Sequence, residues 1–269
     1  MVSSQFSSLL LIASTALSFA APSEKKGTTS AVNTTTCNGQ TYVYNNLAGY
    51  GALPSDSRDK FGDTLGGLGS AIALNQKSWK RNGKSYNGEI WTLPDRGWNT
   101  EGTLNFQPRV HKFLATFTPN DSATVASPSP ANLKLQYLDT VRLSGPDFNP
   151  TTGLDPDVTG HISFPLFPDL PGATYTGDGF GGNGTGGRRI SIDSEGLVIN
   201  DDGTFWVSDE YGPYIYKFSP LGNMIQAIRP PNAYIPQRNG TERYGTCLLH
   251  PVQGEIYLVE SRRHSGQPK

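Results

Sequence analysis

Short apolar runs alternate along this chain with turn residues, a pattern typical of β-strands rather than helices. Residues 68–74 predict a buried strand, while residues 111–118 and 134–142 alternate apolar and polar positions as half-buried strands do. Glycine and proline are abundant, with 31 and 20 of the 269 residues, which favours tight turns between such strands. The pattern therefore predicts an all-β protein.

The clearest unit spans residues 190–230. Asp201-Asp202-Gly203 predicts a hairpin turn, because an Asp-Gly pair favours the backbone conformation that a tight hairpin needs. Four short strands are predicted around this and the following turns, over residues 195–199, 204–208, 214–218 and 224–228. Four antiparallel strands within about 40 residues are typical of one propeller blade.

One pattern occurs three times, beginning at Gly88, Gly203 and Gly254. Each copy has a turn glycine, then a β-branched or aromatic run, then charged residues where the strand ends. Repeats spaced by one or two multiples of roughly 40–50 residues favour a β-propeller built of four-stranded antiparallel blades. A closed ring of six or seven such blades needs about 300 residues, so we expect four to five blades and an incomplete propeller.

The first 20 residues predict a secretory signal peptide. Residues 9–19 are apolar but too few to span a bilayer, and Ser18-Phe19-Ala20 has the small residues of a cleavage site. Residues 21–40 are polar and expected to be mobile, whereas residues 41–269 are expected to form the propeller domain, truncated at its C-terminus. The predicted location is therefore extracellular.

Two further features agree with secretion. Cys37 and Cys247 are the only cysteines, and in an oxidising compartment they predict one disulfide that closes a long loop. Glycosylation is predicted at the four Asn-x-Ser/Thr sites, Asn33, Asn120, Asn183 and Asn239.

Charge and motifs exclude several classes of function. A formal net charge of −1 argues against nucleic acid or an anionic membrane as partner and leaves a small-molecule substrate. The four histidines are scattered, which argues against a local zinc site. Residues 177–182 fit the dinucleotide fingerprint by letters alone, inside a glycine-rich stretch (172–187) that predicts a long exposed loop rather than a strand–helix unit. Oligomeric state does not follow from the sequence.

The hairpin around Asp202 predicts a site. Folding the strands about this turn brings Glu195 alongside Asp209 and Glu210, at the end of the hairpin away from the turn. The other two copies of the repeat bring Asp95, Arg96 and Arg262 to the corresponding end of their own sheets. Clustered carboxylates favour a hard cation such as Ca²⁺, and arginines favour phosphate or carboxylate groups. The alternative is that these charges form salt bridges between blades or end strands in solvated turns.

The same residues resemble a known family. Leu93-Pro94-Asp95-Arg96-Gly97, together with Asp193-Ser194-Glu195-Gly196 and Ser208-Asp209-Glu210-Tyr211-Gly212, is similar to the phytase-like family, also described as "esterase-like activity of phytase", over residues 45–262. The resemblance implies a secreted β-propeller that hydrolyses ester or phosphoester bonds with a divalent cation, Ca²⁺.

From the convergence of charges we predict the roles of these residues. Glu195, Asp209 and Glu210 are expected to hold Ca²⁺ or activate water with Asp95 opposite, whereas Arg96 and Arg262 are expected to stabilise the anionic group of the substrate. Two other functions remain open: a propeller that binds a ligand or glycan without catalysis, and a metal-dependent lactonase.

Overall fold

The computed structural model describes residues 33–44, 47–97, 103–158, 160–238 and 240–244. Strands dominate this part of the chain, and its helices are two single 3₁₀ turns, η1 (Gln76–Ser78) and η2 (Asn232–Tyr234). Neither turn approaches the length and apolarity that a membrane span requires. The all-β prediction is confirmed.

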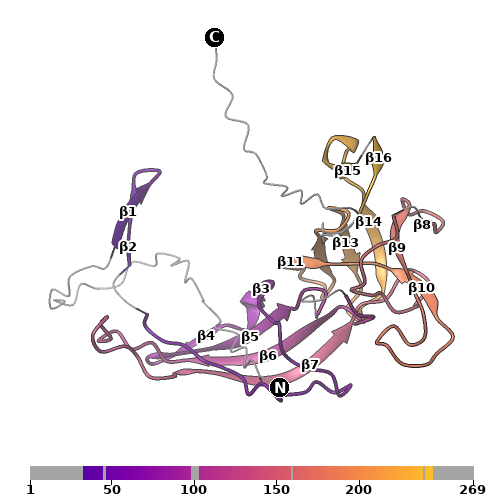
Figure 1. The fold of residues 1–269 in the computed structure, drawn as a ribbon. Coiled ribbons are helices and arrows are strands. Elements are labelled where there is room, and N and C mark those ends of the chain that lie inside the picture. The colour runs from indigo at the N-terminus through magenta and orange to yellow at the C-terminus, as the bar shows by residue number, and fades with distance from the viewer. Residues whose placement is uncertain (1–32, 45–46, 98–102, 159, 239, 245–269) are drawn as a thin grey trace, which may run out of the picture.

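The first large sheet has five antiparallel strands (Figure 1). Its main path runs in the order β3-β5-β6-β7, and a short strand, β4, pairs with the first residues of β5. The strands are β3 (Ala71–Leu74), β4 (Lys80–Asn82), β5 (Ser85–Leu93), β6 (Arg109–Phe117) and β7 (Leu133–Arg142). β6 and β7 lie where the alternation of apolar and polar residues predicts strands, and β3 lies within the predicted buried strand of residues 68–74.

The second large sheet is the blade that the sequence predicts most clearly. Its four strands pair antiparallel in chain order, and each lies within about a residue of its predicted position. They are β11 (Ser194–Ile199), β12 (Phe205–Asp209), β13 (Ile215–Phe218) and β14 (Met224–Ile228). Gly203, in the turn between β11 and β12, has a positive φ of 81°, which explains the need for glycine there.

Smaller sheets complete the described chain. β8 (His161–Ile162), β9 (Leu170–Tyr175) and β10 (Gly187–Ile190) form a three-stranded sheet, and β15 (Gln237–Arg238) pairs with β16 (Thr241–Glu242). The prediction of one long loop over residues 172–187 is thus wrong at both ends, which pair as β9 and β10. The glycines between them form the connecting turn, so local composition concealed the strand pairing.

An N-terminal hairpin begins earlier than expected. β1 (Asn33–Cys37) pairs with β2 (Gln40–Tyr44) inside the segment predicted to be mobile. Three successive threonines favour the strand, and Asn38-Gly39 supplies the two positive φ angles of a tight hairpin turn. All ten strand residues are exposed, and Figure 1 shows the hairpin standing apart from the large sheets.

The principal core lies between the two large sheets. Trp91 and Leu93 of β5 belong to the same buried cluster as Phe205 and Val207 of β12, and the rings of Trp91 and Phe205 meet edge to face at 5.7 Å. A second cluster covers the other face of the first sheet with Leu65 and Leu68 among its members. Two blade-like sheets packed in succession are consistent with an incomplete propeller, and the described residues do not close a ring.

Candidate functional site

The site forms where β11 begins. The pairing of β11 with β12 shifts register between Ser194 and Gly196, so Glu195 occupies a β-bulge. A bulge adds one residue to a strand and redirects its side chain, which explains why Glu195 is exposed while Asp193 and Ser194 beside it are buried. Ser194 also donates its hydroxyl to the carbonyl oxygen of Pro94, at 2.8 Å.

Arg96 joins the end of the first sheet to this point. Its guanidinium Nε lies 3.5 Å from Asp193 Oδ2, and its backbone N–H donates to Asp193 Oδ1 at 3.2 Å. Nη1 donates to the Tyr211 hydroxyl at 2.9 Å and to Asp155 at 3.2 Å. The loops after β5 and before β11 therefore meet, as the alignment of the repeats predicts.

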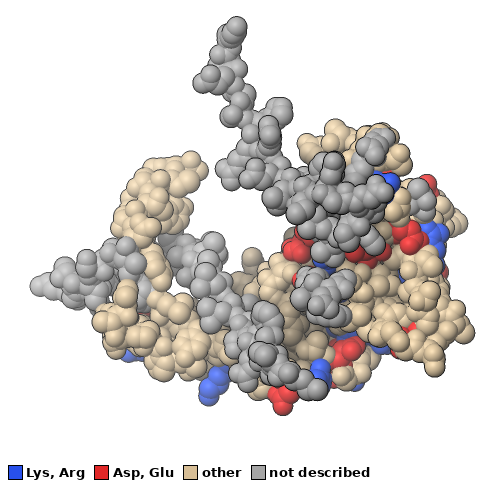
Figure 2. All heavy atoms as spheres, in the orientation of Figure 1, with Lys and Arg blue, Asp and Glu red and all other residues tan. Residues whose placement is uncertain are grey.

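Three carboxyl groups gather beside this arginine. Ligand oxygens of Asp193, Glu195 and Glu210 all lie within 4.8 Å of one another. Asp193 is buried and the two glutamates are exposed, so the cluster is anchored on one side and open to solvent on the other. Figure 2 shows that acidic side chains gather on the part of the molecule formed by β8–β14.

Burial, together with nearby like charges, raises the pKa values of Asp193 and Glu195. Burial, with the nearby charges of Glu210 and Glu195, raises the pKa of Asp193 to about 7 despite the opposing effect of Arg96. Burial also raises the pKa of Glu195, and Glu210 and Asp95 add to the increase. The cluster therefore holds more negative charge than its surroundings neutralise.

The donor set fits a hard divalent cation. Carboxylate oxygens bind Ca²⁺ at about 2.3–2.6 Å, so two oxygens on opposite sides of one ion lie up to about 5 Å apart. The 4.8 Å limit of this cluster is compatible with that spacing. A bound cation would also relieve the repulsion that raises these pKa values.

Asp209 has different surroundings from its neighbour Glu210. Its Oδ1 accepts the backbone N–H groups of Asp193 and Tyr211 at 2.9 and 3.1 Å, and its Oδ2 accepts the Tyr216 hydroxyl at 3.2 Å. Burial raises the pKa of Asp209 to about 7, against the effect of these hydrogen bonds. Its carboxyl group thus holds the start of β11 against the end of β12.

The remaining predicted residues lie in different places. Asp95 is half-buried and accepts a hydrogen bond from the backbone N–H of Gly97 at 2.8 Å. Its negative charge contributes to the raised pKa of Glu195. Arg262 lies outside the described residues, as does the third copy of the repeat. Asp193 was not assigned a role from the sequence, although it is the first residue of the Asp-x-Glu-Gly motif and could have been found there.

The predicted modifications remain predictions. Asn33 and Asn183 are exposed, and Asn120 is half-buried with its side-chain oxygen accepting two hydrogen bonds from Ser122. Asn239 lies outside the described residues. Cys37 is exposed in β1, but Cys247 also lies outside the described residues, so their disulfide is not tested.

The fold and the site together define an all-β protein of blade-like antiparallel sheets, with an acidic cluster that could bind a cation. Residues 64–263 match the family described as "Phytase-like: Esterase-like activity of phytase", and the chain belongs to this family. An "Uncharacterized secreted protein" of Arthroderma benhamiae is 60% identical over 210 residues, which make up 78% of this chain and 41% of that protein. The chain thus spans about two fifths of the length of this relative. No solved structure matches the chain.

Proposed function

We propose that this chain belongs to a secreted hydrolase of ester or phosphoester bonds that binds a divalent cation, Ca²⁺, at Asp193, Glu195 and Glu210. The observation that carries the proposal is the convergence of these three carboxyl groups within 4.8 Å, on the loops that bear the family motif. The description of the relative as a secreted protein and the predicted signal peptide support an extracellular location.

Different residues of the chain would have different roles at such a site. Asp193 would anchor the cation from the buried side, where Arg96 fixes its carboxylate, and Glu195 and Glu210 would complete the site from the solvent side. A bound Ca²⁺ would supply Lewis-acid polarisation of the ester or phosphoryl oxygen.

Arg96 takes a different role from the one expected from the sequence. Its guanidinium contacts Tyr211, Asp155 and Asp193, and its side chain is only 7% exposed. We therefore assign it the positioning of Asp193 rather than contact with the substrate. Recognition of an anionic substrate by Arg262 remains a proposal.

The cation site is tested by thermal unfolding while Ca²⁺ is titrated against EDTA. A ligand that binds only the folded state raises Tm in a saturable manner, and Glu195→Gln with Glu210→Gln should abolish that rise. Asp201→Asn is the matched control, because Asp201 is an exposed acid at the opposite end of the same hairpin. A Tm indifferent to Ca²⁺, or an equal loss in the control, would contradict the cation site.

Hydrolysis is tested separately, with 4-nitrophenyl phosphate and 4-nitrophenyl acetate, each with Ca²⁺ and with EDTA. Turnover of either substrate that depends on Ca²⁺ and falls at least about tenfold in Glu195→Gln supports the proposal and identifies the bond class. Turnover of lactones alone favours the lactonase. Cation binding with no turnover of any of these substrates favours a binding protein and rejects the hydrolase.

A further inference from the structure

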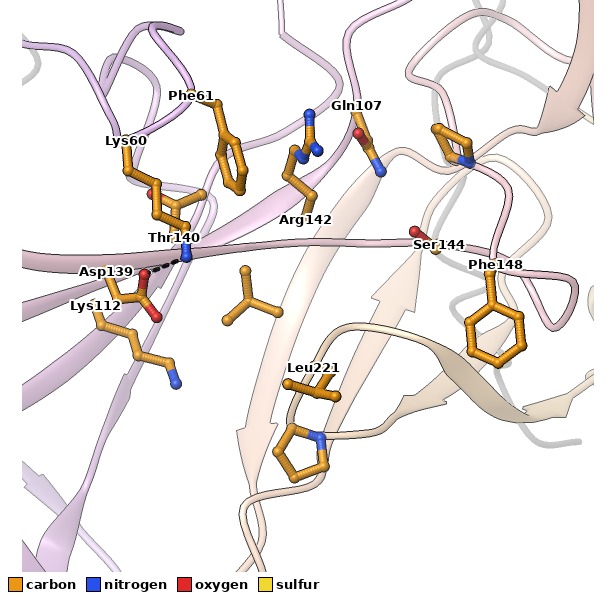
Figure 3. A pocket seen from close by; sticks show the side chains of 13 residues that line it. Lys60, Phe61, Gln107, Lys112, Asp139, Thr140, Arg142, Ser144, Phe148 and Leu221 are labelled. Carbon is orange, nitrogen blue, oxygen red and sulfur yellow. Dashed lines mark hydrogen bonds and ion pairs between the residues drawn. The ribbon is translucent and has the colours of Figure 1, made fainter.

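A pocket of about 380 Å³ lies between the two large sheets and shares no residue with the acidic cluster. One wall comes from Lys60 and Phe61, the base from β6 and β7, and the other wall from residues 144–150 and the turn between β13 and β14 (Figure 3). Its volume lies within the range typical of sites for small ligands.

Positive charge exceeds negative charge in this pocket. Three cationic side chains line it, Lys60, Lys112 and Arg142, against one carboxylate, Asp139. Lys60 pairs with Asp139 at 2.6 Å, and Lys112, opposite Asp139 in the pairing of β6 with β7, is close enough for its charge to lower the pKa of Asp139. Arg142 forms no ion pair with a described residue. The chain as a whole is close to neutral, so this excess of positive charge is local and does not reflect the overall charge.

Lys112 and Arg142 also lie over aromatic rings. The Arg142 guanidinium lies 3.9 Å from the centre of the Phe61 ring, and Lys112 Nζ lies 4.0 Å from the centre of the Trp91 ring. Such contacts orient a cation without neutralising its charge. Both groups therefore remain able to bind an anion.

Exposed apolar side chains complete the walls. Phe148 is 70% exposed and Leu221 is 81% exposed, and Figure 3 shows Phe148 across the pocket from Phe61. Phe148 has a positive φ of 65°, a strained conformation for a bulky residue. Backbone strain of this kind is typically retained at functional sites. Elsewhere, a residue better suited to a positive φ would serve as well.

The base of the pocket is preformed. Ser144 N–H donates to the carbonyl oxygen of Gly222 at 2.8 Å, and Met224 N–H donates to Ser144 O at 2.9 Å. A Cβ at Gly222 would lie 2.1 Å from the carbonyl oxygen of Arg142, so only glycine allows the turn to approach β7 so closely. The wall formed by residues 144–150 and this turn is thus fixed against the base of the pocket before any ligand binds.

We propose that this pocket binds an organic anion, in which a phosphate or carboxylate group is attached to an apolar ring. The anionic group contacts Arg142 and Lys112, and the ring packs against the exposed side chains of Phe148 and Leu221. This site is independent of the proposed hydrolytic centre, because it uses other residues and no metal ion.

Isothermal titration calorimetry with phenyl phosphate in EDTA tests the proposal, with benzoate, inorganic phosphate and benzyl alcohol as comparison probes. Chelation keeps the acidic cluster free of any cation that could recruit phosphate. We expect saturable binding of phenyl phosphate, at least about tenfold tighter than inorganic phosphate or benzyl alcohol, because charge and ring both contribute. Benzoate binding as tightly as phenyl phosphate would identify a carboxylate site, and weaker benzoate binding a phosphate site.

Two variants separate the contributions. Arg142→Gln should weaken phenyl phosphate at least about tenfold. Phe148→Asn removes the ring but suits a positive φ, so it should abolish the advantage of phenyl phosphate over inorganic phosphate without lowering Tm. Lys77→Gln, at an exposed lysine outside the pocket, is the charge control and should leave binding unchanged.

Two outcomes would overturn the proposal. One is the absence of saturable binding of both phenyl phosphate and benzoate up to about 10 mM. The other is an equal loss of affinity in Lys77→Gln and Arg142→Gln, which would indicate diffuse attraction to the protein surface.

Discussion

Two buried arginines, Arg109 and Arg96, each lie among carboxyl groups, yet their surroundings have opposite effects on those groups. Arg109 Nη1 pairs with Asp59 and Nη2 with Asp63, both at 2.7 Å, and the Phe106 ring lies 4.4 Å from the guanidinium. Burial raises the pKa of Asp59, but the hydrogen bond from Arg109 and the backbone N–H groups of Phe61 and Asp63 outweigh it and leave the pKa lowered.

At Arg96 the negative charge is in excess. The arginine contacts Asp155 and Asp193, and Glu195 and Glu210 lie beside Asp193, so at least four carboxyl groups lie in the neighbourhood of one guanidinium. Burial and these neighbours raise the pKa of Asp193 to about 7. The Arg109 cluster thus stabilises the fold by itself, whereas the Arg96 cluster has the charge imbalance of a site that receives a cation.

The largest expected effect comes from breaking the balanced cluster. Arg109→Met leaves Asp59 buried without its partner, and loss of one partner of a buried pair costs about 3–5 kcal/mol of the free energy of unfolding. Urea unfolding measures the change. Lys77→Met, which removes one side of an exposed pair, should cost less than about 1 kcal/mol. Equal costs would show that Arg109 is not a structural pair of this kind.

The second prediction uses pH to separate the two clusters. Asp193 in the folded chain keeps a proton up to about pH 7, while the unfolded chain releases it near pH 4. Without a cation, this group therefore lowers stability as pH rises through that window, by at most about 1.4 kcal/mol per pH unit. Asp209, with its pKa also about 7, acts in the same direction.

His111, beside Arg109, has the opposite effect in the same window. Burial, then the charge of Arg109, lowers its pKa from 6.5 to about 4. The unfolded chain therefore takes up a proton first as pH falls, and this contribution to stability is lost below about pH 6.5. In EDTA, Asp193→Asn should make stability rise more steeply with pH, and His111→Gln should make it rise less or fall. Urea unfolding at several pH values between about 4 and 7 measures both slopes, and unchanged slopes would contradict the assignments.

The sequence predicts the fold better than the site because the two depend on different information. The blade of β11–β14 follows from alternation and from an Asp-Gly turn, which are local. The roles of Asp209 and Glu210 do not follow locally, because both are acidic and adjacent. Only the packing of Tyr216 and the backbone of Asp193 against Asp209 separates a buried carboxyl group from an exposed one.

The contacts of Asp193 and Asp155 with Arg96 show the same limit of prediction from sequence. Each aspartate contacts Arg96 from more than 50 positions away, at separations of 97 and 59 residues. Such contacts arise from sheet packing, which short motifs do not record. The β-bulge at Glu195 is likewise a property of the pairing with β12 and not of the residues before it.

The smallest predicted effect compares one solvent-side acid from each cluster. Asp63 is half-exposed and neutralises Arg109, so Asp63→Asn should lower the free energy of unfolding by about 0.5–1 kcal/mol. Glu210 is exposed and repels Asp193 and Glu195, so in EDTA Glu210→Gln should leave stability unchanged or raise it by a few tenths of a kcal/mol. Saturating Ca²⁺ should reverse the second sign, because the wild type then gains from a ligand that the variant lacks. If both substitutions destabilised equally in EDTA, the two clusters would be electrostatically alike, and the excess negative charge at Arg96 would no longer argue for a cation.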